Sequence, residues 1–379
     1  MSLEGQLFDQ YRIVCQLKSG GMGEVYLADD TRLPRQVAIK VIRIEASRHS
    51  YRQATQEATR LFLREAQAIA QLDHLHILPL HGSGEKFING MRLMYMVMPF
   101  RHEGSLIEWL HKHGKPRVLS VRDVERIINQ AASALQHAHN QKIIHQDVKP
   151  SNFLIQGNAE QVNQLNLQLA DFGVAKFMSK TSESQVIRGT PDYMAPEQWE
   201  GHPVPATDQY ALAVMAYEFL TGSLPFTGSN HKQMWYQHQF VDPQPPSSIN
   251  PNIPEEIDDV LLRALSKNPI DRFGSIEIFA RAFRQALSHS RDIHQTLTIS
   301  PGEARRGTRR VITLPGRKRV TVNVPAGAQN GQVIRLEGLG RPSDYGEPAG
   351  AMIITIDISD VPDMLLCRHF PLVESNIEP

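Results

Sequence analysis

The order of apolar and polar positions divides the first 287 residues into a strand-rich part and a helix-rich part. Residues 25–28 and 37–42 are short β-type runs separated by polar turns, and a helical spacing of apolar side chains follows over residues 55–72. Residues 94–98 predict another strand, after which the spacing is mainly helical up to Leu287. We therefore expect a small sheet with one helix, followed by a larger helical part.

A different pattern begins after Leu287. Residues 288–295 are polar and aperiodic, which predicts a linker. Alternation of valine with polar residues over 320–324, and of isoleucine over 352–358, then predicts strands that are buried on at least one face. We expect an α+β fold arranged as a unit of catalytic size at 11–287, a linker at 288–296, a small all-β domain at 297–366 and a tail at 367–379.

Composition narrows the class of protein. A chain of 379 residues is too long for one ordinary core, and 41% hydrophobic with 21% charged residues is typical of globular proteins. Lys and Arg (40) balance Asp and Glu (40), so net charge does not favour nucleic acid or a membrane surface. The apolar run at 211–220 is too short to span a bilayer and predicts a buried helix.

The two cysteines, Cys15 and Cys367, support neither a disulfide framework nor a cysteine zinc site. The first residues also lack the basic-then-apolar order of a signal peptide. We therefore expect a cytoplasmic protein without a membrane span.

A glycine-rich run between two predicted strands is a candidate phosphate cradle. Gly20 and Gly23 allow backbone N–H groups to approach phosphate oxygens without an intervening Cβ. Lys18 occupies the first glycine position of the G-x-G-x-x-G spacing; we expect the lysine to be tolerated there, with nucleotide affinity as the property open to change. On the next strand Lys40 is flanked by apolar residues, so its ammonium group needs a polar partner.

The strongest chemical signal is the run over residues 145–152. Asp147, Lys149 and Asn152 supply a carboxylate, an ammonium and an amide at a spacing that suits orientation of a hydroxyl, neutralisation of a γ-phosphate and binding of a metal. Asp171 follows a predicted strand and is a second metal-binding group. Further motif residues follow in order: Thr190, Glu197, Asp208 and Arg272.

In this order the motifs make residues 11–287 resemble a bacterial Hanks-type (eukaryotic-like) serine/threonine protein kinase. The resemblance implies a bilobal fold, with a small lobe at 11–98, a hinge at 99–101 and a large lobe at 102–287. It implies transfer of the γ-phosphoryl group of ATP, with Mg2+, to serine or threonine hydroxyls of protein substrates. Two alternatives stay open: a pseudokinase without catalysis, and a scaffold that acts chiefly by binding clients.

The resemblance also assigns roles to single residues. Asp147 would be the catalytic base and Lys149 the γ-phosphate contact, while Lys40 would bind the α- and β-phosphates and pair with Glu65. The Mg2+ ligands would be Asn152 and Asp171. The nucleotide would further contact Lys18, Gly20, Gly23, Val25, Ala38, the gatekeeper Met98 and the hinge residues Pro99 and Arg101. The large lobe would contain a buried ion pair between Glu197 and Arg272.

One departure from the family bears on regulation. Gln146 stands where the family usually has an arginine that pairs with a phosphate on the activation loop. Glutamine cannot form that charge-assisted, bidentate contact. Our hypothesis is that loop phosphorylation is not the main activating switch, and loss of activity on changing all the candidate acceptors to alanine would contradict it. These acceptors are Ser179, Thr181, Ser182 and Ser184.

The C-terminal segment resembles the peptide-binding β-domain of DnaJ-type co-chaperones. The resemblance rests on Glu303-Ala304, Pro325-Ala326-Gly327, Gly331-Gln332 and Arg335-Leu336. It implies an extended peptide or unfolded client bound along a sheet. Because no His-Pro-Asp loop, cysteine-rich zinc module or second β-domain accompanies it, we expect a docking module, and a β-domain without a peptide groove is the alternative.

Two further clusters are expected to be structural. Seven basic residues between positions 305 and 319 lack the interleaved aromatic residues of a nucleic-acid face, so no nucleic-acid partner is expected. His74, His76 and His81 lack a known metal-binding spacing, which favours packing or surface roles.

Overall fold

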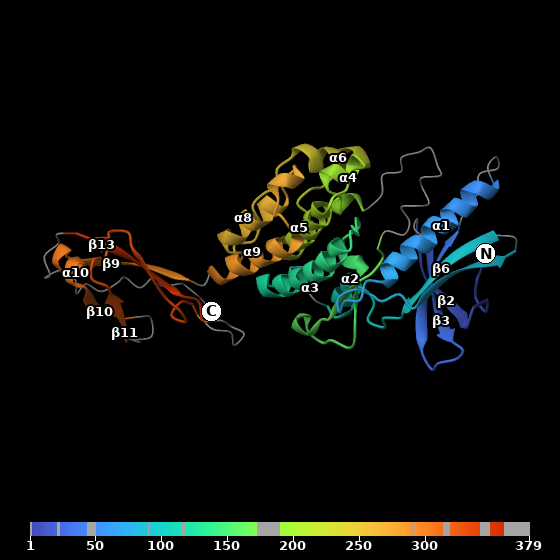
Figure 1. The fold of residues 1–379 in the computed structure, drawn as a ribbon, viewed down its shortest axis with the longest axis horizontal. Helices are drawn as coiled ribbons and strands as arrows, with labels where there is room; N and C mark the ends of the chain where they lie inside the picture. The colour runs from blue at the N-terminus through green and yellow to red at the C-terminus, as the bar shows by residue number, and fades with distance from the viewer. Residues whose placement is uncertain are drawn as a thin grey trace. The chain divides into compact units, whose positions relative to one another are not determined.

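The computed structural model describes residues 2–20, 23–43, 51–89, 91–114, 118–172, 190–289, 292–313, 319–341 and 349–359, without the side chains at 51–58, 61, 65, 289, 294 and 313. The candidate phosphorylation sites at 179–184 and the tail at 367–379 lie outside these ranges. The chain forms two compact units, residues 1–287 and 288–379, each with a hydrophobic core (Figure 1). No helix within the ranges given is both long and apolar enough to cross a bilayer.

The first unit begins with a six-stranded antiparallel sheet in the order β1-β2-β3-β4-β6-β5. The strands are β1 (Leu7–Phe8), β2 (Tyr11–Gly20), β3 (Gly23–Asp30), β4 (Gln36–Arg43), β5 (Gly82–Ile88) and β6 (Met91–Pro99). The helix α1 (Tyr51–Ala70) lies between β4 and β5 in the chain. The strands and the helix predicted for this part are confirmed.

Alternation along β4 gives this sheet two different faces. Val37, Ile39 and Val41 belong to a hydrophobic cluster on one face, together with residues of β2, β3 and β6. Ala38 and Lys40 occupy the alternate positions and therefore face the other side. On that side, Ile42 and Met96 pack with Phe62, Ala66 and Ile69 of α1. β4 thus places the ammonium group of Lys40 next to the space between the small and the large lobe.

Residues 102–287 form the helical part of the first unit. Its helices are α2 (Leu106–Lys112), α3 (Val121–Asn140), α4 (Pro196–Trp199), α5 (Pro205–Thr221), α6 (His231–Phe240), α7 (Pro246–Ile249), α8 (Glu255–Ala264) and α9 (Ile276–His289). A short antiparallel ladder joins β7 (Phe153–Ile155) to β8 (Leu167–Leu169). The strand predicted before Asp171 is short, and a 3-10 turn, η2 (Val162–Gln164), precedes it.

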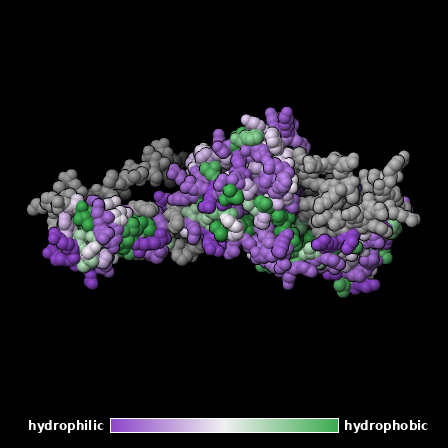
Figure 2. Space-filling model, turned by 45° about the horizontal axis from the view of Figure 1, so that its top comes forward, coloured by the Kyte–Doolittle hydropathy of each residue, from purple (hydrophilic) through white to green (hydrophobic). Residues whose placement is uncertain are grey.

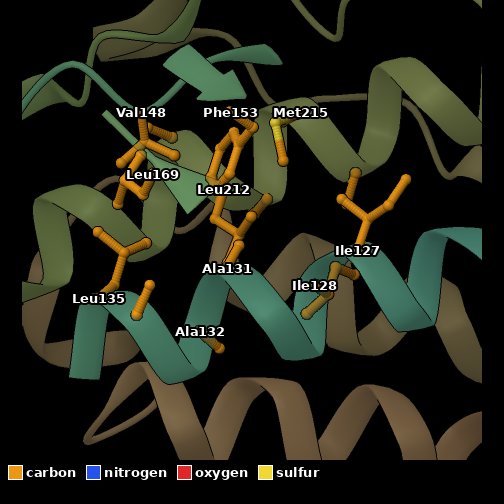
Figure 3. Packing of buried hydrophobic residues seen from close by; sticks show 14 of the residues in the cluster. Ile127, Ile128, Ala131, Ala132, Leu135, Val148, Phe153, Leu169, Leu212 and Met215 are labelled. Carbon is orange, nitrogen blue, oxygen red and sulfur yellow. The ribbon is translucent and has the colours of Figure 1, made fainter. Parts of the chain in front are cut away.

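The core of this part is built on α5 and α3. Residues 211–220 of α5 are buried apart from Glu218, so the predicted buried helix is confirmed. Along α3, Ile127, Ala131 and Leu135 point toward the segment 148–153 and α5 (Figure 3). Their partners in that view include Val148, Phe153, Leu169, Leu212 and Met215.

The second unit is β-rich and contains one short helix, α10 (Pro301–Arg306). Its strands are β9 (Ile293–Ile299), β10 (Thr308–Thr313), β11 (Arg319–Val324), β12 (Val333–Leu336) and β13 (Met352–Ile358). They form a three-stranded sheet, β12-β13-β9, and a two-stranded sheet, β10-β11. On the face of the molecule that Figure 2 shows, hydrophilic residues predominate and hydrophobic residues lie in separate groups.

Most of the predicted linker at 288–296 lies within two elements of the structure. The helix α9 continues to His289 and β9 begins at Ile293, where it pairs in parallel with β13. Ile293, Leu297 and Ile299 face the core of the second unit, but Gln295 interrupts the alternation. Because Gln295 breaks the apolar alternation, the sequence pattern did not predict this strand. The backbone hydrogen bonds of β9 come from its pairing with β13, almost 60 residues later in the chain.

Candidate active site

The catalytic segment after α3 is held in place by one buried carboxylate. Backbone N–H groups of His145 and Gln146 donate to Asp208 Oδ2 and Oδ1 at 2.8 and 2.7 Å. His139 Nε2 lies 2.7 Å from Oδ2 of the same carboxylate. Burial would raise the pKa of Asp208, but these hydrogen bonds, above all that of His139, lower it. Asp208 is therefore an ionised anchor for the segment that carries Asp147.

The backbone in this segment turns sharply at Gln146, whose φ is +65°. Val148 is buried and points into the core, beside Leu169 (Figure 3). Its neighbours Asp147 and Lys149 therefore point away from the core toward the cleft. Gln146 donates its N–H to Asp208 and accepts a hydrogen bond from the side chain of Gln198 at 2.7 Å.

Two residues of the predicted motif, Lys149 and Asn152, contact Asp147. Lys149 Nζ lies 2.8 Å from Oδ2, and Asn152 Nδ2 donates to Oδ2 at 3.1 Å and to the main-chain oxygen at 2.7 Å. The backbone N–H of Thr190 donates to Oδ1 at 3.2 Å, and Lys149 Nζ also donates to Thr190 Oγ1 at 2.6 Å. The carboxylate is thus oriented from both sides.

Lys40 and Asp171 form a second charged pair across the cleft. Lys40 Nζ lies 2.8 Å from Asp171 Oδ1, and the lysine is 6% exposed. Burial would raise the pKa of Asp171, but the Lys40 ammonium lowers it, with smaller contributions from His145 and Lys18. The side chain of Glu65, the predicted partner of Lys40, lies outside the described part of α1, so that pairing stays a prediction.

Asn152 and Asp171 supply oxygen atoms of the kind that Mg2+ prefers. The amide nitrogen of Asn152 is engaged by Asp147, which leaves Oδ1 as the atom that can bind a cation. Asp171 is ionised and bonded to Lys40 through one of its two oxygens. The donor set therefore fits a magnesium ion that is completed by phosphate oxygens and water.

The residues predicted to enclose the adenine share the cleft face of the sheet. Val25 lies opposite Lys40 in the ladder between β3 and β4, and Ala38 lies opposite Met98 in the ladder between β4 and β6. A small cavity is lined by Lys40, Leu78, Met96, Met98, Asp171 and Phe172, among others. The guanidinium group of Arg101 donates to Gln168 Oε1 at 2.9 Å, so the adenine contact predicted for this residue would have to use its main chain.

Glycine is required at one of the two predicted cradle positions described by the structure. Gly23 has a φ of +120°, and a Cβ there would lie 2.6 Å from the main-chain oxygen of Val41. A Cβ on Gly20 would meet nothing within 4 Å, so that position is open to a ligand. Lys18 lies beside an irregularity in the ladder between β2 and β3 and has an exposed side chain.

The predicted ion pair in the large lobe is confirmed. Arg272 Nη1 and Nη2 contact Glu197 Oε1 and Oε2 at 2.8 and 2.9 Å. Three main-chain oxygens, of Ser266, Ala206 and Lys267, accept the remaining N–H groups of this guanidinium. All five donors of a buried arginine are therefore used. Sequence reasoning missed the role of His139 at Asp208, because no local pattern links positions 69 residues apart.

Comparison with known proteins agrees with this geometry. A model of the protein kinase domain matches residues 11–289, and one of the DnaJ C terminal domain matches residues 280–362. Serine/threonine-protein kinase PknF of Mycobacterium tuberculosis is 38% identical over 304 residues, which cover 79% of this chain and 60% of that protein. Serine/threonine-protein kinase PrkC of Bacillus subtilis is 30% identical over 306 residues, 80% of this chain and 44% of that protein.

A solved structure shows the same fold. The crystal structure of the Mycobacterium tuberculosis PknI kinase domain matches with a TM-score of 0.56 and 32% identity, over 76% of this chain and 100% of that one. This chain spans 60% or less of the length of the two curated relatives. The chain belongs to the protein kinase family, and a DnaJ C-terminal domain follows its bilobal α+β unit.

Proposed function

We propose that the chain transfers the γ-phosphoryl group of Mg-ATP to serine or threonine hydroxyls of proteins. The observation that carries this proposal is the convergence of Lys149, Asn152 and Thr190 on the carboxylate of Asp147. The Lys40–Asp171 pair supplies a cation and a metal-binding carboxylate in the same unit. Phosphoryl transfer needs positioning and charge neutralisation more than covalent chemistry, and these groups supply both.

In this proposal Asp147 accepts the proton of the substrate hydroxyl and orients its oxygen toward the phosphorus atom. Lys149, already bonded to Asp147, neutralises charge on the γ-phosphoryl oxygens, and Lys40 holds the α- and β-phosphates. Asn152 and Asp171 would hold Mg2+, which would offset the negative charge of the phosphate groups. Lys149 and Thr190 together support the serine/threonine class of acceptor.

The nucleotide would lie between the glycine-rich turn and the hinge. Val25, Ala38 and Met98 share the cleft face and would contact the adenine, while the Pro99 carbonyl accepts its exocyclic amine. The turn at Lys18, Gly20 and Gly23 would cover the phosphates with backbone N–H groups. A scaffold without catalysis is the weaker reading, because only Gln146 and Lys18 depart from the motifs.

The second unit is proposed to dock extended peptides, either unfolded clients or substrates of the kinase. Its outer strands β9 and β12 flank β13 in the three-stranded sheet, so each offers an edge within the described residues. Val333 on β12 is 56% exposed and could contact an apolar side chain of an added strand. A cytoplasmic location remains a prediction that rests on cysteine usage.

The test is phosphorylation of a generic peptide by the full chain with labelled ATP and magnesium. Replacing Asp147 by Asn keeps the size of the side chain and removes the base, so turnover should fall about 10²–10⁴-fold while ATP binding persists. Asp259→Asn, an exposed aspartate of α8, is the matched control and should leave turnover unchanged. Near-normal turnover of the Asp147→Asn chain would overturn the proposal.

A wild-type chain that binds ATP but transfers no phosphate would instead support the scaffold alternative. Phosphoamino-acid analysis of the product decides the acceptor class, since phosphotyrosine alone would contradict the proposed serine/threonine specificity.

A further inference from the structure

Two lysines lie in one row of residues that crosses β2, β3 and β4 close to the glycine-rich turn. Lys18 of β2 lies opposite Val25 of β3, and Val25 lies opposite Lys40 of β4. β2 and β3 are neighbours in the sheet (Figure 1). Residues directly opposite each other in antiparallel strands point to the same face of a sheet. Because Lys40 faces the cleft, Val25 and Lys18 face the cleft as well.

An extra residue in β2 gives Lys18 this direction. Gln16 lies opposite Tyr26, whose side chain belongs to the hydrophobic cluster on the other face of the sheet. Leu17 follows without a partner in the ladder with β3, and the pairing resumes at Lys18. A bulge of this kind shifts the alternation of a strand by one residue and so changes the face to which the next side chain points. Without the bulge, Leu17 would lie opposite Val25 in place of the lysine.

Two carboxylates of the large lobe lie within electrostatic range of the Lys18 ammonium group. Burial would raise the pKa of Asp171, but Lys40 lowers it, and Lys18 adds a smaller lowering. Burial would also raise the pKa of Glu108 on α2, but hydrogen bonds from Ser105 lower it, and Lys18 again contributes. The charge of Lys18 therefore acts inside the cleft, in agreement with the face to which the ladder assigns it.

Lys18 has no anionic partner among the described residues. Its side chain is exposed and forms no ion pair or hydrogen bond within that part of the chain. Lys40, in contrast, is 6% exposed and lies 2.8 Å from Asp171. The carboxylate of Glu108 caps α2, where it accepts hydrogen bonds from the N–H and the hydroxyl of Ser105 at 2.7 Å each. The ammonium group of Lys18 is therefore available to an anion that enters the cleft.

The two lysines are placed to hold different phosphate groups of one molecule. Their main chains are two inter-strand spacings apart, which is roughly 10 Å. The four-carbon stem of a lysine is flexible, and its ammonium group acts as a point charge toward phosphate oxygens. The glycine-rich turn begins two residues after Lys18, and its backbone N–H groups would cover the same phosphates. A polyphosphate that lies under this turn would therefore come within reach of both cations.

We propose that Lys18 is a second phosphate-binding lysine, whose side chain contacts the phosphate groups of the nucleotide from the β2 side of the cleft. The glycine that the G-x-G-x-x-G motif has at this position supplies no such contact. Lys18 favours nucleoside di- and triphosphates, because AMP offers too few phosphate oxygens to engage both Lys18 and Lys40. The inference rests on the nucleotide site of the proposed function, but it does not require phosphoryl transfer at Asp147.

The experiment is equilibrium binding of ATP, ADP, AMP and adenosine to the full chain, measured by calorimetry. Lys18→Gln removes one charge-assisted hydrogen bond, so ATP and ADP should bind about tenfold more weakly. The affinity for adenosine should stay unchanged, because adenosine has no phosphate. Lys18→Arg keeps the charge and should keep most of the affinity for ATP. Lys232→Gln, at an exposed lysine of α6, is the matched control and should change no affinity.

Two further measurements separate a phosphate contact from an effect on the shape of the turn. Lys18→Gly restores the residue of the motif and should weaken ATP binding relative to adenosine binding as much as Lys18→Gln does, because both variants lack the ammonium group. Raising the ionic strength from about 0.05 M to about 0.5 M should weaken ATP binding by the wild type. The dependence on ionic strength should be smaller in both variants.

A change at Glu108 tests whether Lys18 acts by pairing with this carboxylate across the cleft. Glu108→Gln removes the charge and keeps a side chain that can complete the capping box with Ser105. We expect this variant to bind ATP at least as tightly as the wild type, because an anion that competes for Lys18 is gone. A loss of ATP affinity as large as that of Lys18→Gln would contradict the phosphate contact.

Two results at Lys18 itself would overturn the proposal. In the first, the Lys18→Gln chain binds ATP as tightly as the wild type. In the second, it loses affinity for adenosine to the same extent as for ATP. Both results would leave the nucleotide site of the proposed function in place, whereas a wild-type chain that binds neither ATP nor adenosine would refute that function and this inference together.

Discussion

The two units of this chain differ in what they bury. The first unit buries charged groups: Asp208 and Arg272 are 0% and 2% exposed, and Lys40 is 6% exposed. Each is surrounded by partners that offset the cost of removing it from water. The hydrophobic core described for the second unit is apolar, and the side chain of Asp292, which is 3% exposed, is paired with the partly exposed Arg335.

The difference follows from what each unit is expected to do. A phosphoryl-transfer site needs charges that are fixed in position and shielded from water, so the fold must stabilise them with networks. A sheet that offers an edge to a peptide needs strands and an apolar core. Charge networks and apolar packing should therefore respond differently to substitution and to pH.

The largest effect on stability is expected at the buried ion pair. Arg272→Met leaves the carboxylate of Glu197 buried without its cation, so we expect a loss of about 3–5 kcal/mol in the free energy of unfolding. Urea denaturation at pH 7 measures it. Arg281→Met, which breaks an exposed pair on α9, should cost about 0.5 kcal/mol or less.

A double variant sharpens this test. Changing Glu197 to Met as well removes the unpaired charge, so Arg272→Met with Glu197→Met should recover much of the loss. Equal losses of unfolding free energy for Arg272→Met and Arg281→Met would contradict the expectation that the buried charge network makes a special contribution to the stability of the first unit.

The next effect should appear on acidification. Burial and the Lys267 ammonium lower the pKa of His238 to about 3, although the main-chain groups of Asp192 and Pro191 raise it. Between pH 6.5, the ordinary pKa of histidine, and the lowered pKa, His238 is protonated in the unfolded chain but neutral in the folded chain. The free energy of unfolding therefore decreases as the pH is lowered through this range. The loss by pH 4 is about 3 kcal/mol.

Unfolding free energies at pH 7 and pH 4 test this expectation. His238→Gln should reduce the difference in unfolding free energy between pH 7 and pH 4. His231→Gln, at an exposed histidine of the same helix, should leave that difference unchanged. The same slope in all three chains would rule out His238 as a source of acid sensitivity.

The smallest effect is expected in the core of the second unit. Ile354 on β13 is 1% exposed, and Ile354→Val removes one methylene from that core, which costs about 0.5–1.5 kcal/mol. Hydrogen exchange of the amides of β9 and β13 should speed up accordingly. Ile353→Val, on the half-buried face of the same strand, should have less effect.

The first unit should be unaffected by Ile354→Val in the second. Because the first unit has its own core, exchange in α3 and α5 and the phosphorylation of a generic peptide should be unchanged by Ile354→Val. Faster exchange in those helices would show that the two cores are coupled.

The sequence by itself determined the elements and the chemistry that lie within short runs. Strands at 25–28, 37–42 and 94–98 and the buried helix at 211–220 follow from local periodicity, because each pattern is complete within a few residues. Asp147, Lys149 and Asn152 come together in the structure because they belong to one turn of chain after α3.

Only the tertiary structure decided which distant groups meet. It paired Lys40 with Asp171, placed His139 on Asp208, brought His137 to His74, and turned the expected linker into a strand paired with β13. The partners in these pairs are separated by 59 to 131 residues, and no local pattern encodes such contacts. They form when the two lobes and the second sheet pack their own cores, which is a property of the whole fold.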